Sequence, residues 1–298
     1  MSAIRTKTAL LALALLAPAV ARGEGVGLRH LKSVYLDDKD GPLRLPEGVA
    51  CDDRGALVVA DTGNGRLLLY EWKNGALTGG RPLKLAQLSY PVRVQIDSKG
   101  NVLVLDRKVR RIGRVDARGE FGGYLDLAGA SGPAPVPTAF KLDASDNAHV
   151  LDVAGARVLV LDGTGSIARE IPLPPGTEVT DIAVDAGGRI YAMDAIRATL
   201  WVAEKGGKAF KPLGASLKDR MSFPGYLTVN RGRIFVVDQN GDGLVELGHD
   251  GAYQGRELAL GWTDGLLYYP GQICIDGRGD TFVADRQNNR VQIFGATR

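Results

Sequence analysis

Short apolar runs alternate with polar positions along this chain, and the same arrangement returns six times. In each copy, a strand-like run is followed by a turn, a second apolar run and a closing Asp. A fixed period of this length, built from strands and turns, predicts a propeller or a solenoid. The copies are 42 to 46 residues apart and begin at Pro46, Pro91, Pro137, Val179, Pro224 and Pro270. Their closing acids are Asp61, Asp106, Asp152, Asp194, Asp238 and Asp285.

The first copy shows how one repeat should fold. Residues 49–51 and 56–60 are apolar runs, and residues 52–55 between them have the Asp and Gly typical of a tight turn. Further strands are expected at 67–70 and 83–85, and four antiparallel strands make one propeller blade. The sequence therefore predicts an all-β fold, a six-bladed β-propeller of four-stranded antiparallel blades, with residues 22–298 as a single domain.

The last repeat ends with its third strand, near residues 291–294, so the sixth blade lacks an outer strand. Residues 28–38 precede the first repeat and have no blade of their own. We expect this segment to be the missing strand and to close the ring, because closure removes an open sheet edge that would invite aggregation.

The amino-acid sequence of the repeats resembles that of the NHL family of β-propellers. Residues 46–52 read Pro-Glu-Gly-Val-Ala-Cys-Asp, and residues 60–66 read Ala-Asp-Thr-Gly-Asn-Gly-Arg. A segment similar to residues 60–66 recurs at residues 283–290, which read Val-Ala-Asp-Arg-Gln-Asn-Asn-Arg. The resemblance covers nearly all of the chain after residue 21 and implies a propeller fold. NHL-like propellers include lyases, RNA readers, sensor domains and interaction scaffolds, so the resemblance implies little about activity.

The first 21 residues have the features of a secretory signal peptide. Arg5 and Lys7 precede the uncharged apolar run 9–17, and Ala-Val-Ala at 19–21 suits cleavage near Ala21. We expect a periplasmic or secreted monomer without membrane insertion. Loss of the two cations lowers the formal net charge from +3 to +1. That near-balance argues against nucleic acid as a partner.

Four of the closing acids have an Arg five residues later, at Arg66, Arg111, Arg157 and Arg290. In the fourth and fifth copies, Thr199 and Gly243 stand in its place. Catalysis requires one special site, whereas this pair recurs around the ring. We therefore interpret the repeated Asp and Arg as a structural brace within each blade.

Candidate ligand-binding residues come from positions where the copies disagree. Alternate residues of each first strand are apolar throughout, while those between them vary in type. Because strand side chains alternate in direction, we expect the variable ones to gather around the central channel. They are Arg93, Gln95, Lys141, Asp181, Tyr226 and Gln272. Glu47, Tyr90 and Tyr269 should lie beside them at strand entrances.

Two interpretations of this cluster remain open. The charges could neutralise one another in a hydrated channel, with Arg93 or Lys141 paired to Asp181, because buried charges need partners. Alternatively, two cations, a carboxylate and tyrosines could bind a small anionic or polyhydroxylated molecule, or a charged side chain of a protein partner.

Signals for metal or catalysis are weak. His30, His149 and His249 are too dispersed to predict a three-His zinc site of the kind that some amidating lyases of this fold use. Residues 238–243 resemble part of a calcium loop through Asp238, Asn240 and Asp242, but the twelfth position is His249 instead of Glu. Calcium is thus the one cofactor that the sequence allows, and we otherwise expect none.

Two further features leave alternatives open. The basic run 107–111 could be a solvated connection or a docking patch for an acidic partner. Cys51 and Cys274 belong to neighbouring blades of the closed ring and could form a disulfide or remain too far apart. The function predicted is an exported, non-catalytic binding scaffold that engages a protein or a small polar or anionic ligand at one channel end. The alternative is a propeller lyase or lactonase-like hydrolase, with a possible divalent metal.

Overall fold

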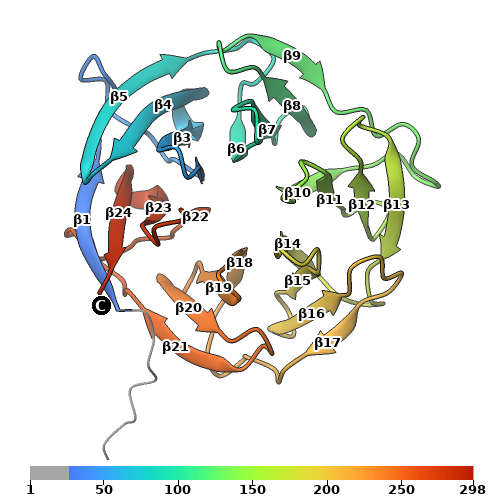
Figure 1. Ribbon diagram of the computed structural model, residues 1–298. Helices are drawn as coiled ribbons and strands as arrows, with labels where there is room; N and C mark the ends of the chain where they lie inside the picture. Colours follow the sequence, from blue (N-terminus) through green and yellow to red (C-terminus); the bar gives the residue numbers. More distant parts are fainter. Residues whose placement is uncertain (1–26, 298) are drawn as a thin grey trace, which may run out of the picture.

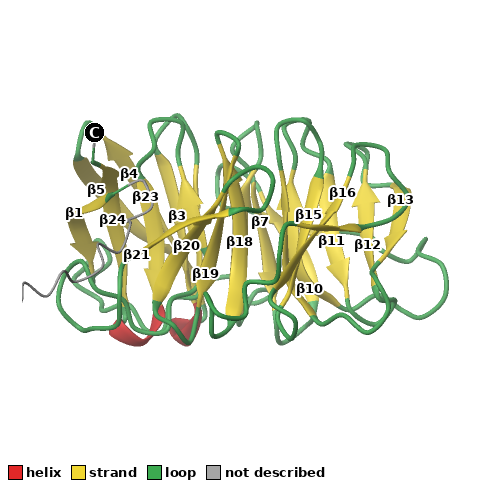
Figure 2. Cartoon of the chain, turned by 90° about the horizontal axis from the view of Figure 1, so that it is seen from below, coloured by secondary structure: helices red, strands yellow, loops and turns green. Residues whose placement is uncertain are grey.

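The computed structural model describes residues 27–297, so the predicted signal peptide lies outside the described part. Six four-stranded antiparallel sheets stand around a central axis, as Figure 1 shows, and the predicted six-bladed propeller is confirmed. Seen from the side, the strands run between two layers of connections (Figure 2). Within residues 27–297, no helix has the length and apolar character needed to cross a bilayer.

The strands follow the repeat, with each blade running from the channel outward. Blade 1 consists of β2 (Gly48–Cys51), β3 (Ala56–Asp61), β4 (Arg66–Lys73) and β5 (Ala76–Leu83). Blade 2 consists of β6 (Pro91–Ile96), β7 (Val102–Asp106), β8 (Arg111–Val115) and β9 (Phe121–Tyr124). Blade 3 consists of β10 (Pro137–Leu142), β11 (Ala148–Asp152), β12 (Arg157–Leu161) and β13 (Ile167–Pro172).

The second half of the ring repeats this order. Blade 4 consists of β14 (Val179–Val184), β15 (Ile190–Asp194), β16 (Thr199–Ala203) and β17 (Lys211–Leu213). Blade 5 consists of β18 (Pro224–Asn230), β19 (Arg233–Asp238), β20 (Gly243–Leu247) and β21 (Tyr253–Glu257). Blade 6 begins with β22 (Ile273–Ile275), β23 (Thr281–Asp285) and β24 (Arg290–Ala296). Two short 3-10 turns, η1 (Thr62–Asn64) and η2 (Arg286–Asn288), follow β3 and β23.

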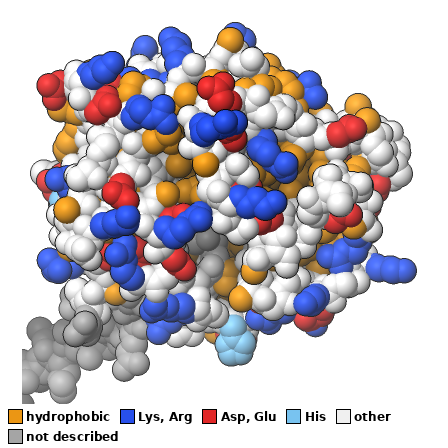
Figure 3. Space-filling view, turned by 45° about the horizontal axis from the view of Figure 1, so that its top comes forward, with side chains coloured by type: hydrophobic (Ala, Val, Ile, Leu, Met, Phe, Trp, Pro, Cys, Tyr) orange, Lys and Arg blue, Asp and Glu red, His pale blue; other side chains and the backbone are white. Residues whose placement is uncertain are grey.

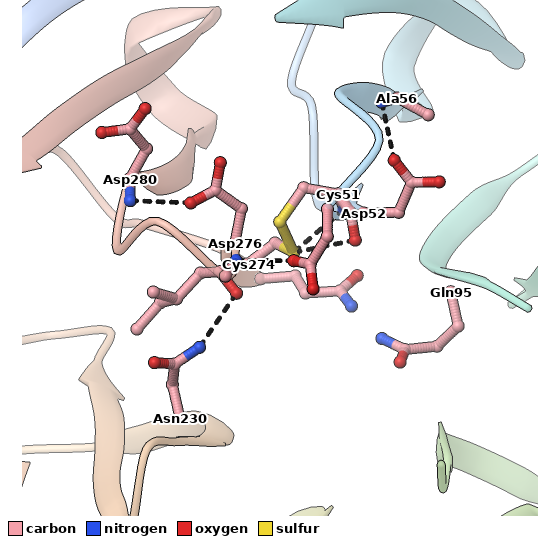
Figure 4. The surroundings of a disulfide bond; sticks show 12 residues. Cys51, Asp52, Ala56, Gln95, Asn230, Cys274, Asp276 and Asp280 are labelled. Atoms are coloured by element: carbon pink, nitrogen blue, oxygen red, sulfur yellow. Dashed lines mark hydrogen bonds between the residues drawn. A yellow bond between two sulfur atoms is a disulfide. The ribbon is translucent and has the colours of Figure 1, made fainter. Parts of the chain in front are cut away.

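The ring is closed by the N-terminal strand, as predicted. Strand β1 (Leu28–Val34) pairs antiparallel with β24 and completes blade 6, where blue and red ribbons lie side by side in Figure 1. A disulfide between Cys51 and Cys274, with a Cα–Cα distance of 5.8 Å, also joins blade 1 to blade 6 (Figure 4). Two connections, one hydrogen-bonded and one covalent, therefore hold the first blade to the last.

The core lies between the blades. One apolar residue of each first strand is buried in every blade, and these residues are Val49, Val94, Phe140, Ile182, Leu227 and Ile273. Each such side chain contributes about 1.5–3 kcal/mol when it is buried. Six copies of one packing layer thus set the spacing of the blades and the position of the inner strands.

The closing acids are braces, and all six are fully buried. Each accepts a backbone N–H from the connection that enters its own blade, as in Arg44 N to Asp61 at 2.7 Å and Tyr90 N to Asp106 at 2.6 Å. The corresponding donors in blades 3 to 6 are Val136, Glu178, Phe223 and Tyr268. The equivalent carboxylate of each blade therefore anchors the connection that enters that blade.

The guanidinium partners are more varied than predicted. Three of the expected pairs form, at Asp61–Arg66, Asp152–Arg157 and Asp285–Arg290. In blade 2 the prediction is wrong, because Arg111 lies 4.0 Å above the Tyr124 ring instead of pairing with Asp106. In blades 4 and 5 the closing acid pairs with an Arg from another position, in the ion pairs Asp194–Arg197 and Asp238–Arg256.

Candidate functional site

A pocket of about 390 Å³ opens at one end of the central axis. This end, termed here the pocket face, is formed by the connections between second and third strands and by those between blades, and includes η1 and η2 at the bottom of Figure 2. The opposite end, termed the hairpin face, has the turns between first and second strands. All six blades contribute to the pocket, and its charged lining residues are Glu47, Arg93, Arg107, Arg110 and Arg286.

The pocket floor unites three of the predicted residues. The Arg93 guanidinium lies 3.0 Å from the Asp181 carboxylate and 4.2 Å above the Tyr226 ring. Asp181 is fully buried and also accepts the Leu227 N–H at 2.8 Å. Burial raises the pKa of Tyr226 to about 12, so its hydroxyl stays protonated at neutral pH. The predicted pairing of Arg93 with Asp181 is present, and Arg93 and Tyr226 both line the pocket.

The other predicted residues, Gln95, Lys141 and Gln272, do not line this pocket. Gln272 reaches from blade 6 to the first strand of blade 2, where it accepts the Val94 N–H at 3.1 Å and donates to the Val94 carbonyl at 2.9 Å. Gln95 is directed toward the disulfide end of the channel (Figure 4). Burial lowers the pKa of Lys141, although the nearby Asp181 opposes that shift. Of the six predicted residues, Arg93 and Tyr226 line the pocket, and the role of all six in ligand binding remains a prediction.

Strand irregularities shape the pocket wall. The pairing register shifts by one residue at the start of β6, β10, β14 and β18, so one residue of each strand is bulged. A bulge re-aims side chains at a strand end. The bulged residues all line the pocket, and they are Val92, Thr138, Thr180 and Gly225.

Two arginines of the rim share one carboxylate. Arg107 binds Glu47 with two hydrogen bonds, of 2.6 Å to Oε2 and 3.1 Å to Oε1, and Arg286 Nε binds Oε1 at 3.0 Å. The Arg107 guanidinium also lies 5.8 Å from the Tyr90 ring centre, and that of Arg286 lies 5.5 Å from the Tyr269 ring centre. Burial lowers the pKa of Arg107, but the Glu47 carboxylate outweighs it and raises that pKa overall. The rim cations are thus held in place before any ligand arrives.

Arg110 differs from the other rim cations. It precedes the third strand of its blade and has a φ of 54°, in the left-handed region. The equivalent residues of the other blades share this conformation and are Gly65, Ala156, Ala198, Asp242 and Asn289. Left-handed backbone costs an Arg roughly 1 kcal/mol, and its presence in all six blades makes it a structural feature of this connection. The Arg110 side chain lines the pocket, and no carboxylate within residues 27–297 pairs with it.

The site has an excess of positive charge. Four guanidinium groups face two carboxylates, Glu47 and Asp181, which leaves a formal charge of +2 without counting the buried Lys141. Charge of one sign in a concave site with low-dielectric walls attracts the opposite ion. The arrangement is therefore suited to an anion with one or two charges, and aromatic surface from Phe223, Tyr226 and Tyr269 adjoins it.

Glu47 and Tyr269, expected at strand entrances, line the pocket, and so do Arg107 and Arg110 of the basic run 107–111. The sequence did not single out Gln239 and Arg286, which also line it. Arg107, Gln239 and Arg286 each directly follow the closing Asp of their repeat, and all three line the pocket. The same repeat position holds Thr62, Val153 and Ala195 in the other blades. A comparison of the copies at this position would have shown the same kind of disagreement that selected Arg93 and Tyr226.

The carboxylates of the calcium-like loop have other partners. Asp238 accepts backbone N–H groups of Ser222 and Phe223 at 2.8–3.0 Å, and Asp242 accepts that of Tyr269 at 2.5 Å. Across the part of the chain that the structure describes, no group of three or more His, Cys, Asp and Glu side chains could hold a metal ion. Calcium binding at Asp238, Asn240 and Asp242 stays a prediction without support from this geometry.

Neither a family model nor a curated protein matches the sequence. Solved structures do resemble it in fold. A streptogramin B lyase is 12% identical with a TM-score of 0.64, covering 89% of this chain and 97% of the lyase. A gluconolactonase from Xanthomonas campestris is 15% identical with a TM-score of 0.67, covering 91% and 89%. A nidogen/laminin complex contains a chain that is 14% identical with a TM-score of 0.57, covering 72% and 80%.

These similarities establish the fold and nothing finer. Six-bladed propellers of this shape include a lyase, a lactonase and a chain from a complex between two proteins. Identities of 12–15% do not carry an activity from one to another. The NHL family is not named among them, so the confirmed part of the resemblance is the six-bladed propeller.

Proposed function

We propose that this protein is an exported binding scaffold that takes up an anionic group in the pocket. The ligand is a small anionic molecule or an anionic group of a protein partner. The excess of two positive charges in a recessed site, with arginines held over tyrosine rings, is the observation that supports the proposal. Arginine suits carboxylate and phosphate because its planar fork makes two parallel hydrogen bonds.

The most informative variant is Arg110→Met. Replacement of Arg93 would leave the buried Asp181 without its cation, so lost binding could reflect damage to the floor. Arg110 has no such partner, and its loss should spare the fold. The matched control is Arg118→Met, because Arg118 is an exposed Arg of the same blade at a hairpin turn.

Binding would be measured by calorimetry with succinate and with inorganic phosphate at low ionic strength. We expect one of these probes to bind, Arg110→Met to weaken it at least tenfold, and Arg118→Met to change little. Binding should also weaken as salt is raised, because the attraction is electrostatic. Equal affinity in both variants, or no binding of either probe at millimolar concentration, would overturn the proposal.

A lyase or lactonase activity is the second candidate, favoured by the fold shared with the streptogramin B lyase and the gluconolactonase. It would need polar pocket residues to act on a lactone or a streptogramin B. The donor set of residues 27–297 does not fit a metal centre. Turnover of gluconolactone or a streptogramin B by purified protein, lost in Arg110→Met, would favour this candidate over a scaffold.

Export is part of the proposal. The sequence features of residues 1–21 support it, and so does the disulfide, because such bonds persist mainly outside the cytoplasm. Mass spectrometry of the protein from cell fractions would test both, since cleavage near Ala21 and a periplasmic or secreted location are expected together.

A further inference from the structure

Exposed hydrophobic side chains are concentrated at one end of the ring. Within residues 27–297, nine large hydrophobic residues are exposed, and only Tyr253 lies in a strand. The other eight belong to connections on the pocket face, and they are Tyr35, Leu36, Val109, Val153, Ile196, Leu260, Trp262 and Tyr268. Single exposed apolar residues are ordinary, whereas their collection around a recessed site marks an interaction surface.

Three of these residues lie at equivalent places on the pocket face of consecutive blades. Val109, Val153 and Ile196 occupy the connections between second and third strands in three consecutive blades, at 107–110, 153–156 and 195–198. We call these three residues the apolar crescent. Their connections carry the sequences Arg-Lys-Val-Arg, Val-Ala-Gly-Ala and Ala-Ile-Arg-Ala, with four cations and no carboxylate.

The charge pattern differs on the other side of the molecule. Figure 3, which looks onto the hairpin face and the outer wall of blades 1 and 2, shows Lys and Arg interspersed with Asp and Glu. Mixed charge of that kind is typical of a solvated surface. The crescent instead combines apolar contact area with charge of one sign, which is complementary to an acidic partner that also has apolar side chains.

We propose that the apolar crescent and the pocket together bind a peptide segment of a partner protein that is acidic and apolar. One carboxylate, from a side chain or a chain end, enters the pocket, and neighbouring apolar side chains of the segment cover the crescent. This inference rests on the proposed anion site and adds the identity of its occupant.

Two observations favour a peptide carboxylate over a lipid surface. Arg107 donates two hydrogen bonds to the carboxylate of Glu47. A guanidinium of the rim can therefore orient a planar carboxylate through two contacts. The crescent consists of β-branched side chains, whereas the exposed aromatic residues of the pocket face, Tyr35, Trp262 and Tyr268, belong to the connections that enter blades 1 and 6.

The test is a selection from a displayed library of random twelve-residue peptides, with the disulfide-bonded protein immobilised. We expect the enriched peptides to combine Asp or Glu with apolar residues and to be displaced by succinate. The crescent variant Val109→Ser/Val153→Ser/Ile196→Ser should bind a selected synthetic peptide at least tenfold more weakly. Its affinity for succinate should be unchanged. Tyr253→Ser, near the hairpin face, is the matched control and should bind the peptide normally.

The outcomes separate this inference from the proposed function. If succinate binds but no peptide is enriched, or the peptides lack acidic residues, or the crescent variant retains full peptide affinity, the inference is wrong and the anion site survives. If Arg110→Met binds succinate normally, the anion site itself is wrong. Retention on phosphatidylglycerol vesicles that is lost in the crescent variant would assign the surface to lipid and overturn the inference.

Discussion

Glu47 and Arg107 meet across the boundary between blades 1 and 2 in a two-point ion pair, with oxygen–nitrogen distances of 2.6 and 3.1 Å. Glu47 is buried, whereas slightly more than half of the Arg107 side chain is exposed to the pocket mouth. The carboxylate thus positions a cation that remains accessible to a ligand. It also competes with any anion that approaches the same guanidinium.

Replacement of Glu47 by Gln should separate these two effects. Glu47→Gln raises the formal excess charge of the site from two to three and removes the competing carboxylate. We therefore expect succinate or phosphate to bind several-fold more tightly in calorimetry. The free energy of unfolding in urea should fall by about 1–3 kcal/mol, because two arginines lose a charged hydrogen-bond partner.

Glu71→Gln is the control for this substitution. Glu71 pairs with Lys73 on the exposed surface of blade 1, so its loss should alter neither binding nor stability measurably. Weaker anion binding by Glu47→Gln would show that Glu47 positions the rim arginines more than it competes with the ligand.

The repeat pattern was sufficient to predict the architecture because the same physical requirement recurs in every blade. A buried residue such as Val49 and a brace such as Asp61 must be present each time, so they are visible in one sequence. The closing strand was predictable for a related reason, since a six-fold repeat with a missing strand has one available segment to complete it.

The site was less predictable because side chains reach it from different backbone positions. Arg93 and Tyr226 come from first strands, while Arg107 and Arg286 come from the connections above them. A guanidinium can also replace another from a distance, as Arg256 does for the missing Arg of blade 5. Spacing along the chain therefore identifies repeated contacts well and identifies convergent side chains poorly.

Gln272 should matter more for stability than for binding. Its side-chain amide satisfies both the N–H and the carbonyl of Val94 in the buried inner ring. In Gln272→Leu the buried Val94 N–H loses its partner, whereas the Val94 carbonyl keeps the hydrogen bond from Gln95 Nε2. An unsatisfied buried group costs about 1–3 kcal/mol, so we expect urea denaturation to show a loss of about that size, with succinate binding retained.

Gln95→Leu offers a close comparison, because Gln95 is half-buried and makes one hydrogen bond to the same carbonyl. Its loss should cost at most about 1 kcal/mol. Equal stability of the two variants would contradict the bridging role of Gln272.

The disulfide should be a major part of ring stability. Cys51 and Cys274 are 223 residues apart, and a cross-link over so long a loop restricts the unfolded chain by about 5 kcal/mol in the chain-entropy view. Cys51→Ser/Cys274→Ser should therefore unfold at lower urea concentration and with a steeper dependence on urea, because its unfolded chain is less compact. Two titratable thiols in the denatured, unreduced wild type would show instead that the bond does not form.

Buried His149 should make the fold sensitive to mild acid. Its Nε2 lies 3.3 Å from Asp143 Oδ2, and Nδ1 is buried without a hydrogen-bond partner in the described structure. Burial lowers the pKa of His149, Asp143 opposes the shift, and the charge of Arg169 adds to it. The folded protein therefore resists a proton that the unfolded chain accepts below about pH 6.5.

The free energy of unfolding should consequently decrease as the pH falls from about 6.5 to the lower pKa of folded His149, at no more than about 1.4 kcal/mol per pH unit. Above pH 6.5 the residue is neutral in both states and has no effect. His149→Gln should flatten this part of the curve, whereas His249→Gln, at an exposed position, should leave it as in the wild type. The dependence of the unfolding free energy on pH would be measured by urea denaturation at closely spaced pH values between about 7.5 and 5, a range that spans the usual His pKa of about 6.5. Identical slopes for His149→Gln and wild type would mean that His149 accepts its proton equally well in the folded state.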